Sequence, residues 1–353
     1  MFSERIQSII VDSRQSIIRT MKLMDEACTK SLLVFDGEHF VGLITIGDLQ
    51  RAIIAGRPFS TPIGGLIDNS AKTYARQGED IREIKKWMKE VRAEYMPVLD
   101  SDGNLVDVIF WSDVLSDVPV SDRKKIDVPV VIMAGGKGTR LSPLTNVIPK
   151  PLVPVGDKTI LELILDQFEG IGCSKFYMSV NYKADMIRYY FDRLDKKYDI
   201  QFIQEDKPLG TIGGISLLRD KINAPFFVSN CDGINEQDYR DVYDYHVANR
   251  NDLTIVTMVK TFRIPYGVIE TGQDGLLTSL SEKPELTYQV NTGVYILNPC
   301  CIDRIQDGEF LHITELMERL RADGGRVGCF PVSEHSWRDM GEWPEYLRMI
   351  NVI

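Results

Sequence analysis

The segment after one apolar strand carries three glycines, an arginine and a lysine at a spacing suited to anion chemistry. The glycines are Gly135, Gly136 and Gly138; Arg140 follows them, and Lys150 lies between two prolines. Backbone N–H groups of glycines approach a ligand closely and form an anion cradle, to which the two side chains add full positive charge. The segment therefore predicts a polyphosphate site.

The spacing differs from that of the two common phosphate-binding loops. The NTPase loop places Lys-Ser or Lys-Thr directly after its last glycine, whereas Gly138 is followed by Thr139 and Arg140. The dinucleotide fingerprint needs a third glycine where Leu141 stands. A plain strand–helix turn is the alternative. Such a turn requires neither cation, nor the proline frame that holds Lys150 in extended backbone.

The same segment resembles the signature of the sugar-1-phosphate nucleotidyltransferases, the nucleotide-sugar pyrophosphorylases. The matching runs are Gly-Gly-Lys-Gly-Thr-Arg-Leu-Ser-Pro-Leu-Thr and Pro-Lys-Pro-Leu-Val-Pro-Val, and the resemblance covers roughly residues 127–353. It implies that the loop binds a nucleotide and that three cations act in catalysis. The implied loop residues are Ala134, Gly135, Gly136, Gly138 and Thr139, and the implied cations are Arg140, Lys150 and Lys283.

Strands and helices alternate from Val128 onward, which predicts an α/β fold with a Rossmann-like, mixed and mostly parallel sheet. Thr159 and Glu162 have the spacing of a capping box at the start of a helix over 161–168. Ligands of such sheets bind at the carboxyl ends of the strands, where the glycine loop lies. The other expected strands are 175–180, 200–203, 225–230 and 253–259, and the other expected helices are 184–194 and 238–249.

Two aspartates are candidate metal ligands. Asp232 ends the buried strand Pro-Phe-Phe-Val-Ser-Asn-Cys-Asp, and Asp339 lies in Trp-Arg-Asp-Met-Gly-Glu-Trp. Phosphate chemistry usually needs Mg²⁺, which prefers one or two carboxylates together with phosphate oxygens and water. The family resemblance assigns both residues to the metal. Taken singly, Asp232 also fits a turn and Asp339 a helix cap.

Three later stretches add to the resemblance. Glu205, Gly210 and Thr211 belong to a run similar to the family's nucleoside-binding loop. The resemblance implies that Glu282 accepts hydrogen bonds from sugar hydroxyls, that Lys283 meets the sugar phosphate and that Asn291 orients the ring. The implied sugar-binding residues are Tyr266, Gly267, Glu282, Asn291 and Thr292.

The first 116 residues contain one pattern twice, over about 1–60 and 61–116. Each copy reads as an amphipathic helix, a strand, an Asp/Gly turn, a second strand and an aspartate that opens a helix. A polar, charged linker follows. We expect two domains, 1–124 and 125–353.

This repeat resembles a tandem pair of CBS domains, β-α-β modules that commonly bind adenine nucleotides. The family's Thr-x-x-Asp pattern matches Thr45 and Asp48 in the first copy. The second copy keeps Asp113 but has Phe110 in place of the threonine. Helix capping is the alternative role for both aspartates, since aspartate is a favoured N-cap residue.

Composition excludes several classes of protein. A net charge of −10 argues against nucleic acid or an anionic membrane as a partner. The six cysteines form no Cys-x-x-Cys pair and read as reduced thiols of a cytoplasmic protein. The first residues lack the apolar core of a signal peptide, and no run has membrane-spanning length.

The expected reaction joins an NTP and a sugar 1-phosphate into a nucleotide sugar and pyrophosphate. The resemblance favours GTP with mannose-type or glucosamine 1-phosphate, in bacterial surface-glycan synthesis, with Mg²⁺ as cofactor and adenine nucleotide as a regulator at the CBS pair. We also expect a homo-oligomer. The alternatives are a CTP- or dTTP-dependent enzyme and a non-catalytic CBS nucleotide sensor.

Overall fold

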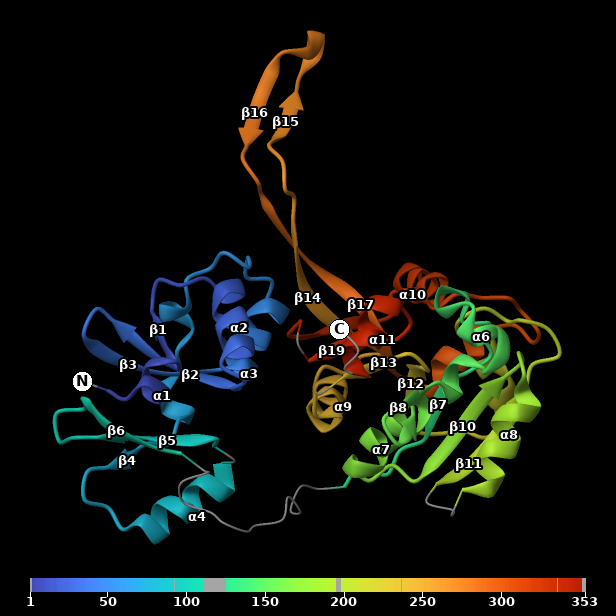
Figure 1. Cartoon of the computed structure of the whole chain (residues 1–353), viewed down its shortest axis with the longest axis horizontal. Helices are drawn as coiled ribbons and strands as arrows, with labels where there is room; N and C mark the ends of the chain where they lie inside the picture. Colours follow the sequence, from blue (N-terminus) through green and yellow to red (C-terminus); the bar gives the residue numbers. More distant parts are fainter. Residues whose placement is uncertain are drawn as a thin grey trace. The chain divides into compact units, whose positions relative to one another are not determined.

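The computed structural model describes residues 2–91, 93–110, 125–194, 198–235, 237–334 and 336–350. The chain folds into two compact units, which Figure 1 shows with their elements labelled. The N-terminal unit combines residues 1–122 with residues 261–287, and the second unit combines residues 123–260 with residues 288–353. Asp113 and most of the expected linker lie outside the described residues.

The two N-terminal repeats fold with the same topology, as the repeated sequence pattern predicts. In each sheet the first strand pairs in parallel with the second, and the second pairs antiparallel with the third. An amphipathic helix separates the first strand from the second. The first sheet contains β1 (Ile10–Asp12), β2 (Ser31–Asp36) and β3 (His39–Thr45) with α2 (Ile17–Glu26), and the second contains β4 (Ala75–Arg76), β5 (Tyr95–Leu99) and β6 (Leu105–Phe110) with α4 (Ile81–Val91).

The second unit is built on a seven-stranded sheet in the order β11-β10-β7-β12-β17-β14-β18. Strands β11, β10, β7 and β12 are parallel neighbours, β17 runs antiparallel to β12, and β14 is parallel to β18. The prediction of a mixed, mostly parallel sheet is thus confirmed. The strands are β7 (Val130–Met133), β10 (Lys175–Val180), β11 (Asp199–Gln204), β12 (Phe226–Asn230), β14 (Leu253–Arg263), β17 (Glu285–Leu297) and β18 (Val327–Val332).

The central strand β7 is buried on both faces, which explains its continuous apolar sequence. Val130 and Ile132 belong to one core cluster and Val131 to another, and all three are fully buried. On the first face, Phe168 of α7 (Ile160–Ile171) stacks on Tyr239 of α9 (Tyr239–Ala248). Helix α7 begins with the expected capping box, since Thr159 and Glu162 each bond the other's backbone N–H.

The remaining elements are short or connect the sheet strands. No helix in the described part of the chain is long and apolar enough to cross a membrane. All six cysteines are free thiols. The helices are α1 (Glu4–Gln7), α3 (Ile46–Ile54), α6 (Leu144–Val147), α8 (Ala184–Arg193), α10 (Ile313–Ala322) and α11 (Trp343–Met349), and the short strands are β8 (Pro154–Val155), β9 (Lys158–Thr159), β13 (Gly233–Asn235), β15 (Val268–Thr271), β16 (Leu277–Ser281) and β19 (Trp337–Asp339).

Candidate active site

A two-stranded ribbon brings the two candidate metal aspartates together. Strand β13 follows Asp232 directly and pairs antiparallel with β19. In this pairing Gly233 of β13 lies opposite Asp339 of β19. The backbone N–H of Met340 donates to the carbonyl oxygen of Asp232 at 2.8 Å. A short ladder thus joins carboxylates that lie more than a hundred residues apart in the sequence.

The ribbon is anchored on β17, an interior strand of the main sheet. The Trp337 indole N–H donates to the carbonyl oxygen of Thr292 in β17 at 3.1 Å. A Cβ atom at Gly233 would lie 2.9 Å from the Trp337 indole nitrogen, so this close packing requires glycine. The Thr292 hydroxyl is buried and donates to the carbonyl oxygen of Val256 at 2.8 Å. These contacts give Thr292 a structural role in holding the ribbon.

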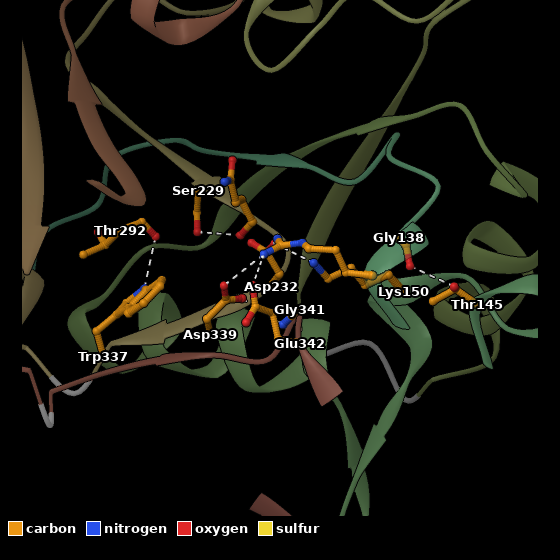
Figure 2. Close-up of polar contacts among 12 residues, drawn as sticks. Gly138, Thr145, Lys150, Ser229, Asp232, Thr292, Trp337, Asp339, Gly341 and Glu342 are labelled. Carbon is orange, nitrogen blue, oxygen red and sulfur yellow. Dashed lines mark hydrogen bonds and ion pairs between the residues drawn. The ribbon is translucent and has the colours of Figure 1, made fainter. Parts of the chain in front are cut away.

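Two cations meet the two aspartates (Figure 2). The Lys150 Nζ lies 2.5 Å from Asp232 Oδ2. The Arg140 guanidinium reaches Asp232 Oδ2 at 3.4 Å, Asp339 Oδ2 at 3.3 Å and Glu342 Oε1 at 3.1 Å. Two cations therefore share three carboxylates, and the structure joins four of the predicted site residues in one ion-pair network.

The two cations differ in their exposure to solvent. Only 8% of the Lys150 side chain is exposed, compared with 52% of the Arg140 side chain. Burial alone would lower the pKa of Arg140, but Asp339, Glu342 and Asp232 outweigh it and raise the pKa above its usual value. Arg140 therefore carries positive charge at neutral pH, as phosphate binding requires.

The glycine loop lies against the same lysine. Gly138 has a left-handed backbone (φ +65°), and a Cβ atom there would lie 2.8 Å from Lys150 Cβ. The Thr145 hydroxyl donates to the carbonyl oxygen of Gly138 at 2.8 Å and closes the loop. At Gly136 a Cβ atom would meet nothing within 4 Å. The loop thus holds Lys150 on one side and faces open space at Gly136.

The rest of the loop connects sheet and helix. The backbone N–H of Ala134 donates to the Ser179 carbonyl oxygen at 2.8 Å, which extends the β7–β10 pairing. At Gly135 a Cβ atom would lie 3.3 Å from Asn181 Cβ. Thr139 begins a short 3₁₀ helix that carries Arg140 toward the carboxylates. The predicted loop residues thus form one continuous segment that leads from β7 to Arg140 and its ion pairs.

The predicted nucleoside loop is held by buried polar contacts. Glu205 is buried; it accepts from the Ser179 hydroxyl at 2.5 Å and from the Leu209 N–H at 3.1 Å. A Cβ atom at Gly210 would overlap the Leu311 carbonyl oxygen, so only glycine fits there. The Thr211 hydroxyl accepts from the backbone N–H of Ile313 at the start of α10. These contacts fix the loop's shape; nucleotide binding by its side chains stays a prediction.

The predicted sugar residues are divided between the two units. In the second unit, the Asn291 side chain donates to the Tyr295 hydroxyl and accepts from the Gly293 N–H, and Thr292 follows it in β17. The other three lie within 261–287, where β15 and β16 form a hairpin, together with the predicted catalytic residue Lys283. There a Cβ atom at Gly267 would lie 2.9 Å from Glu282 Oε2. Tyr266, Gly267, Glu282 and Lys283 therefore gather at the base of the hairpin, and their approach to Asp232 stays a prediction.

In the first N-terminal repeat, Thr45 and Asp48 form a capping box that starts α3. Asp48 is buried and pairs with Lys72 at 2.6 Å and also with Arg51. Burial would raise the pKa of Asp48, but Lys72 and Thr45 lower it overall. The capping role foreseen as an alternative is thus present, together with two cations at the same carboxylate.

Sequence reasoning missed two members of the network, Gly341 and Glu342. Both stand beside Asp339 in the Asp-Met-Gly-Glu run, which was the only signal available. The Gly341 N–H donates to Asp339 Oδ1 at 2.8 Å. A Cβ atom at Gly341 would lie 2.6 Å from Lys150 Nζ and 3.0 Å from Arg140 Nη2. Because Gly341 has no side chain, Lys150 Nζ and Arg140 Nη2 can both lie in this space.

The donor set at the ribbon fits a hard divalent cation. Asp232 and Asp339 offer carboxylate oxygens, and Mg²⁺ prefers one or two carboxylates plus substrate phosphates. Among the described residues, no group of three or more His, Cys, Asp or Glu side chains is arranged to hold a metal. Because Mg²⁺ takes only one or two protein carboxylates, Asp232 and Asp339 suit a metal whose remaining ligands come from substrate and water.

Comparisons with protein families match the two halves of the chain. The profile of the nucleotidyl transferase family matches residues 129–353, and the profile of the CBS domain matches residues 5–55. The resemblance on which the sequence predictions depend is therefore confirmed for the nucleotidyltransferase half and for the first CBS repeat.

Curated relatives are similar over the nucleotidyltransferase half. A mannose-1-phosphate guanyltransferase of Schizosaccharomyces pombe is 33% identical over 226 residues, which is 62% of this chain and 62% of the relative. A probable mannose-1-phosphate guanylyltransferase 1 of Oryza sativa is 30% identical with the same coverage. The corresponding enzyme of Saccharomyces cerevisiae is 36% identical over 185 residues, half of each chain. The chain thus spans about half to three fifths of the length of these relatives.

Two solved structures share the fold. HddC from Yersinia pseudotuberculosis superposes with a TM-score of 0.51 and 28% identity, over 64% of this chain and 99% of that one. A putative glucose-1-phosphate thymidylyltransferase from Bacillus anthracis gives a TM-score of 0.50 at 19% identity, over 64% of this chain and 94% of that one. The expected nucleotidyltransferase fold is confirmed.

Proposed function

The chain belongs to the nucleotidyl transferase family, and from this we propose that it transfers the guanylyl group of GTP to a sugar 1-phosphate and releases pyrophosphate. The observation that carries the proposal is the meeting of Lys150 and Arg140 with Asp232 and Asp339 beside the glycine loop. This arrangement provides phosphate-binding cations and metal-binding carboxylates at one place. We take mannose 1-phosphate as the first sugar to test and glucosamine 1-phosphate as the second.

The reaction needs no covalent intermediate. An oxygen of the sugar phosphate is already a nucleophile; it attacks the α-phosphorus of GTP in line, and pyrophosphate leaves with the electron pair. Arg140 and the loop N–H groups would hold the departing β- and γ-phosphates, and Lys150 would draw the two anionic reactants together. Catalysis is then positioning and stabilisation of charge.

Members of this family generally use a divalent metal. We propose Mg²⁺, with Asp232 and Asp339 as its protein ligands. When bound, Mg²⁺ would neutralise negative charge on the reacting phosphates. The carboxylates would orient that charge, and the ribbon that joins them would keep their spacing constant during the reaction.

The hairpin base would bind the sugar phosphate. Glu282 would accept hydrogen bonds from sugar hydroxyls, and Gly267, opposite it, would let the ring approach the backbone. Lys283 would meet the phosphate and Asn291 the ring. Tyr266 is exposed and free to cover the sugar. These roles follow the family resemblance residue by residue.

The choice of guanine depends on the relatives named above, each of which is described as a mannose-1-phosphate guanylyltransferase or guanyltransferase. A CTP- or dTTP-dependent enzyme is the alternative with the same mechanism. A non-catalytic nucleotide sensor is the alternative of another class.

The test is pyrophosphate release with Mg²⁺. GTP, CTP, UTP, dTTP and ATP are each combined with mannose 1-phosphate, glucosamine 1-phosphate and glucose 1-phosphate, and Asp232→Asn serves as the blank. Release confined to GTP supports the guanylyl assignment and names the sugar. Release with another nucleotide overturns the assignment of the base but keeps the mechanism. If folded protein releases no pyrophosphate in any combination, the result favours the non-catalytic nucleotide sensor.

The contacts of Asp48 favour a second, regulatory role. The buried carboxylate holds Lys72 and Arg51 beside Thr45, so two cations lie close to the position where the CBS resemblance places a nucleotide phosphate. We propose that AMP or ATP binds there and changes turnover. Calorimetry on the full chain tests this; absence of adenine-nucleotide binding would make the CBS pair a structural or oligomerisation device.

A further inference from the structure

We propose that Arg140 and Lys150 occupy the metal-binding carboxylates of the substrate-free protein, so that a divalent cation enters only together with the phosphates that draw these cations away. The proposal rests on the function proposed above and deepens it: it states how metal and nucleotide depend on each other at the same site.

The first argument is the occupancy of the carboxylate oxygens. Asp232 Oδ2 is 2.5 Å from Lys150 Nζ and 3.4 Å from Arg140 Nη2. Asp339 Oδ2 receives Arg140, and its Oδ1 receives the N–H of Gly341. Mg²⁺ binds carboxylate oxygen at about 2.0–2.1 Å. An ion at that distance from Asp232 Oδ2 would compete with an ammonium group already in contact with the same atom.

The second argument is the confined space. A Cβ atom at Gly341 would lie 2.6 Å from Lys150 Nζ, 2.8 Å from Asp339 Oδ1 and 3.0 Å from Arg140 Nη2. Both cations and one carboxylate therefore converge on the volume of a single methyl group. Entry of a third, divalent positive charge requires that at least one of the cations leaves.

The third argument is that Lys150 cannot simply turn into water. Its side chain is almost completely buried, and a buried ammonium group needs an anionic partner. A phosphate group is such a partner. When the polyphosphate accepts Lys150, Asp232 becomes free to bind metal. Lys150 thus exchanges the carboxylate for a phosphate, and the metal takes its place at Asp232.

Arg140 is held differently. It is half-exposed, and its shortest contact is with Glu342 at 3.1 Å, while Asp339 and Asp232 lie slightly farther away. Glu342 thus keeps the guanidinium close to both aspartates. Because coupling between two ligands is reciprocal, the metal must strengthen polyphosphate binding by the same factor by which polyphosphate strengthens metal binding.

The first experiment measures Mn²⁺ binding to the full chain without phosphate, by counting free Mn²⁺ by electron paramagnetic resonance. Carboxylate sites that suit Mg²⁺ also suit Mn²⁺. We expect Arg140→Met to bind Mn²⁺ at least about 5-fold more tightly than wild type, the lower end of typical couplings. Arg140→Lys keeps the charge and should stay close to wild type.

Lys158→Met is the matched control. Lys158 pairs with Asp166 of α7 at 2.5 Å and is 50% exposed, so its loss changes the net charge as the loss of Arg140 does. Mn²⁺ affinity should not change in this variant. The proposal is overturned if Arg140→Met binds Mn²⁺ no better than wild type, or if Lys158→Met gains as much.

The second experiment adds inorganic pyrophosphate. Asp232→Asn/Asp339→Asn protein is the blank that subtracts the manganese–pyrophosphate complex of free solution. We expect pyrophosphate to tighten Mn²⁺ binding at least about 5-fold in wild type and less in Arg140→Met. Equal affinity with and without pyrophosphate removes the coupling but leaves the proposed function intact. No Mn²⁺ bound above the blank in either condition removes the metal site, and with it the proposed mechanism.

Discussion

The Lys150 ammonium lies 2.5 Å from the Asp232 carboxylate, although the two residues stand 82 positions apart in the sequence. Lys150 opens a 3₁₀ turn that follows the glycine loop, while Asp232 ends the segment after β12 and receives the Met340 N–H on its backbone. Backbone contacts thus hold both partners in place. The Lys150 ammonium is therefore already in position to bind a phosphate group that enters beside Asp232.

Asp232→Asn tests the carboxylate in that pair. We expect turnover to fall at least about 100-fold, the effect of losing one preorganised charged group. The free energy of unfolding should fall by about 1–3 kcal/mol, because Lys150 stays buried beside a neutral amide. Pyrophosphate release and urea unfolding give the two values.

The control for this variant is Asp166→Asn, which breaks the ion pair between Asp166 of α7 and the half-exposed Lys158. Turnover should stay at the wild-type level, with a stability loss of at most about 1 kcal/mol from the ion pair. Near wild-type turnover in Asp232→Asn would exclude this residue from the mechanism.

Gly341→Ala tests the space between the cations. The new methyl group would meet the flexible ends of Lys150 and Arg140, so the fold should tolerate it with a cost of about 1 kcal/mol. Turnover should fall about 10- to 100-fold, because both cations are displaced from their positions. Gly170→Ala in α7, where a Cβ atom meets nothing within 4 Å, is the control. Unchanged turnover in Gly341→Ala would show that the cations need not converge there.

Thr211→Val separates a structural role from a nucleotide-binding one. The Thr211 hydroxyl accepts from the Ile313 N–H, an otherwise unpaired donor at the start of α10. Its loss should cost about 1 kcal/mol of stability, as for a helix cap, and Thr211→Ser should restore it. Thermal unfolding and the KM for GTP are measured together. A large rise in KM at unchanged stability would instead make Thr211 a nucleotide ligand.

His246 makes the second unit sensitive to acid. Burial lowers its pKa below the usual value, against the opposing effects of Asn298 and Asp252. The unfolded chain therefore binds a proton more readily, and stability should fall as the pH drops below about 6.5, by at most about 1.4 kcal/mol per pH unit for this one proton. Urea unfolding between pH 8 and pH 5 measures the slope.

His246→Gln provides the comparison. The imidazole contacts the Thr254 hydroxyl at 2.9 Å and Asn298 Oδ1 at 3.2 Å, so the variant should lose stability at neutral pH. Its stability should also change less with pH than that of wild type over the same range. A slope equal to the wild-type slope would assign the acid sensitivity to other groups.

Local signals in the sequence determined where several of the strands and helices lie. The apolar run before Gly135 and the capping box at Thr159 each depend on neighbouring residues, and the structure has both where they were expected. The repeated pattern of the N-terminal half depends on local alternation too, and two small three-stranded sheets form there. Hydrophobic periodicity and helix capping are properties of short segments, so they can be recognised in a single sequence.

Only the tertiary structure decided which charges meet. Nothing near Asp339 in the sequence states that β19 pairs with β13, and without that pairing Asp339 has no defined distance to Asp232. The same holds for Glu342 as a partner of Arg140, and for Thr211 as the acceptor for α10. The residue types that do the chemistry can be read along the chain. Their distances depend on pairings between segments far apart in the sequence, which are established only when the sheet and its ribbon form.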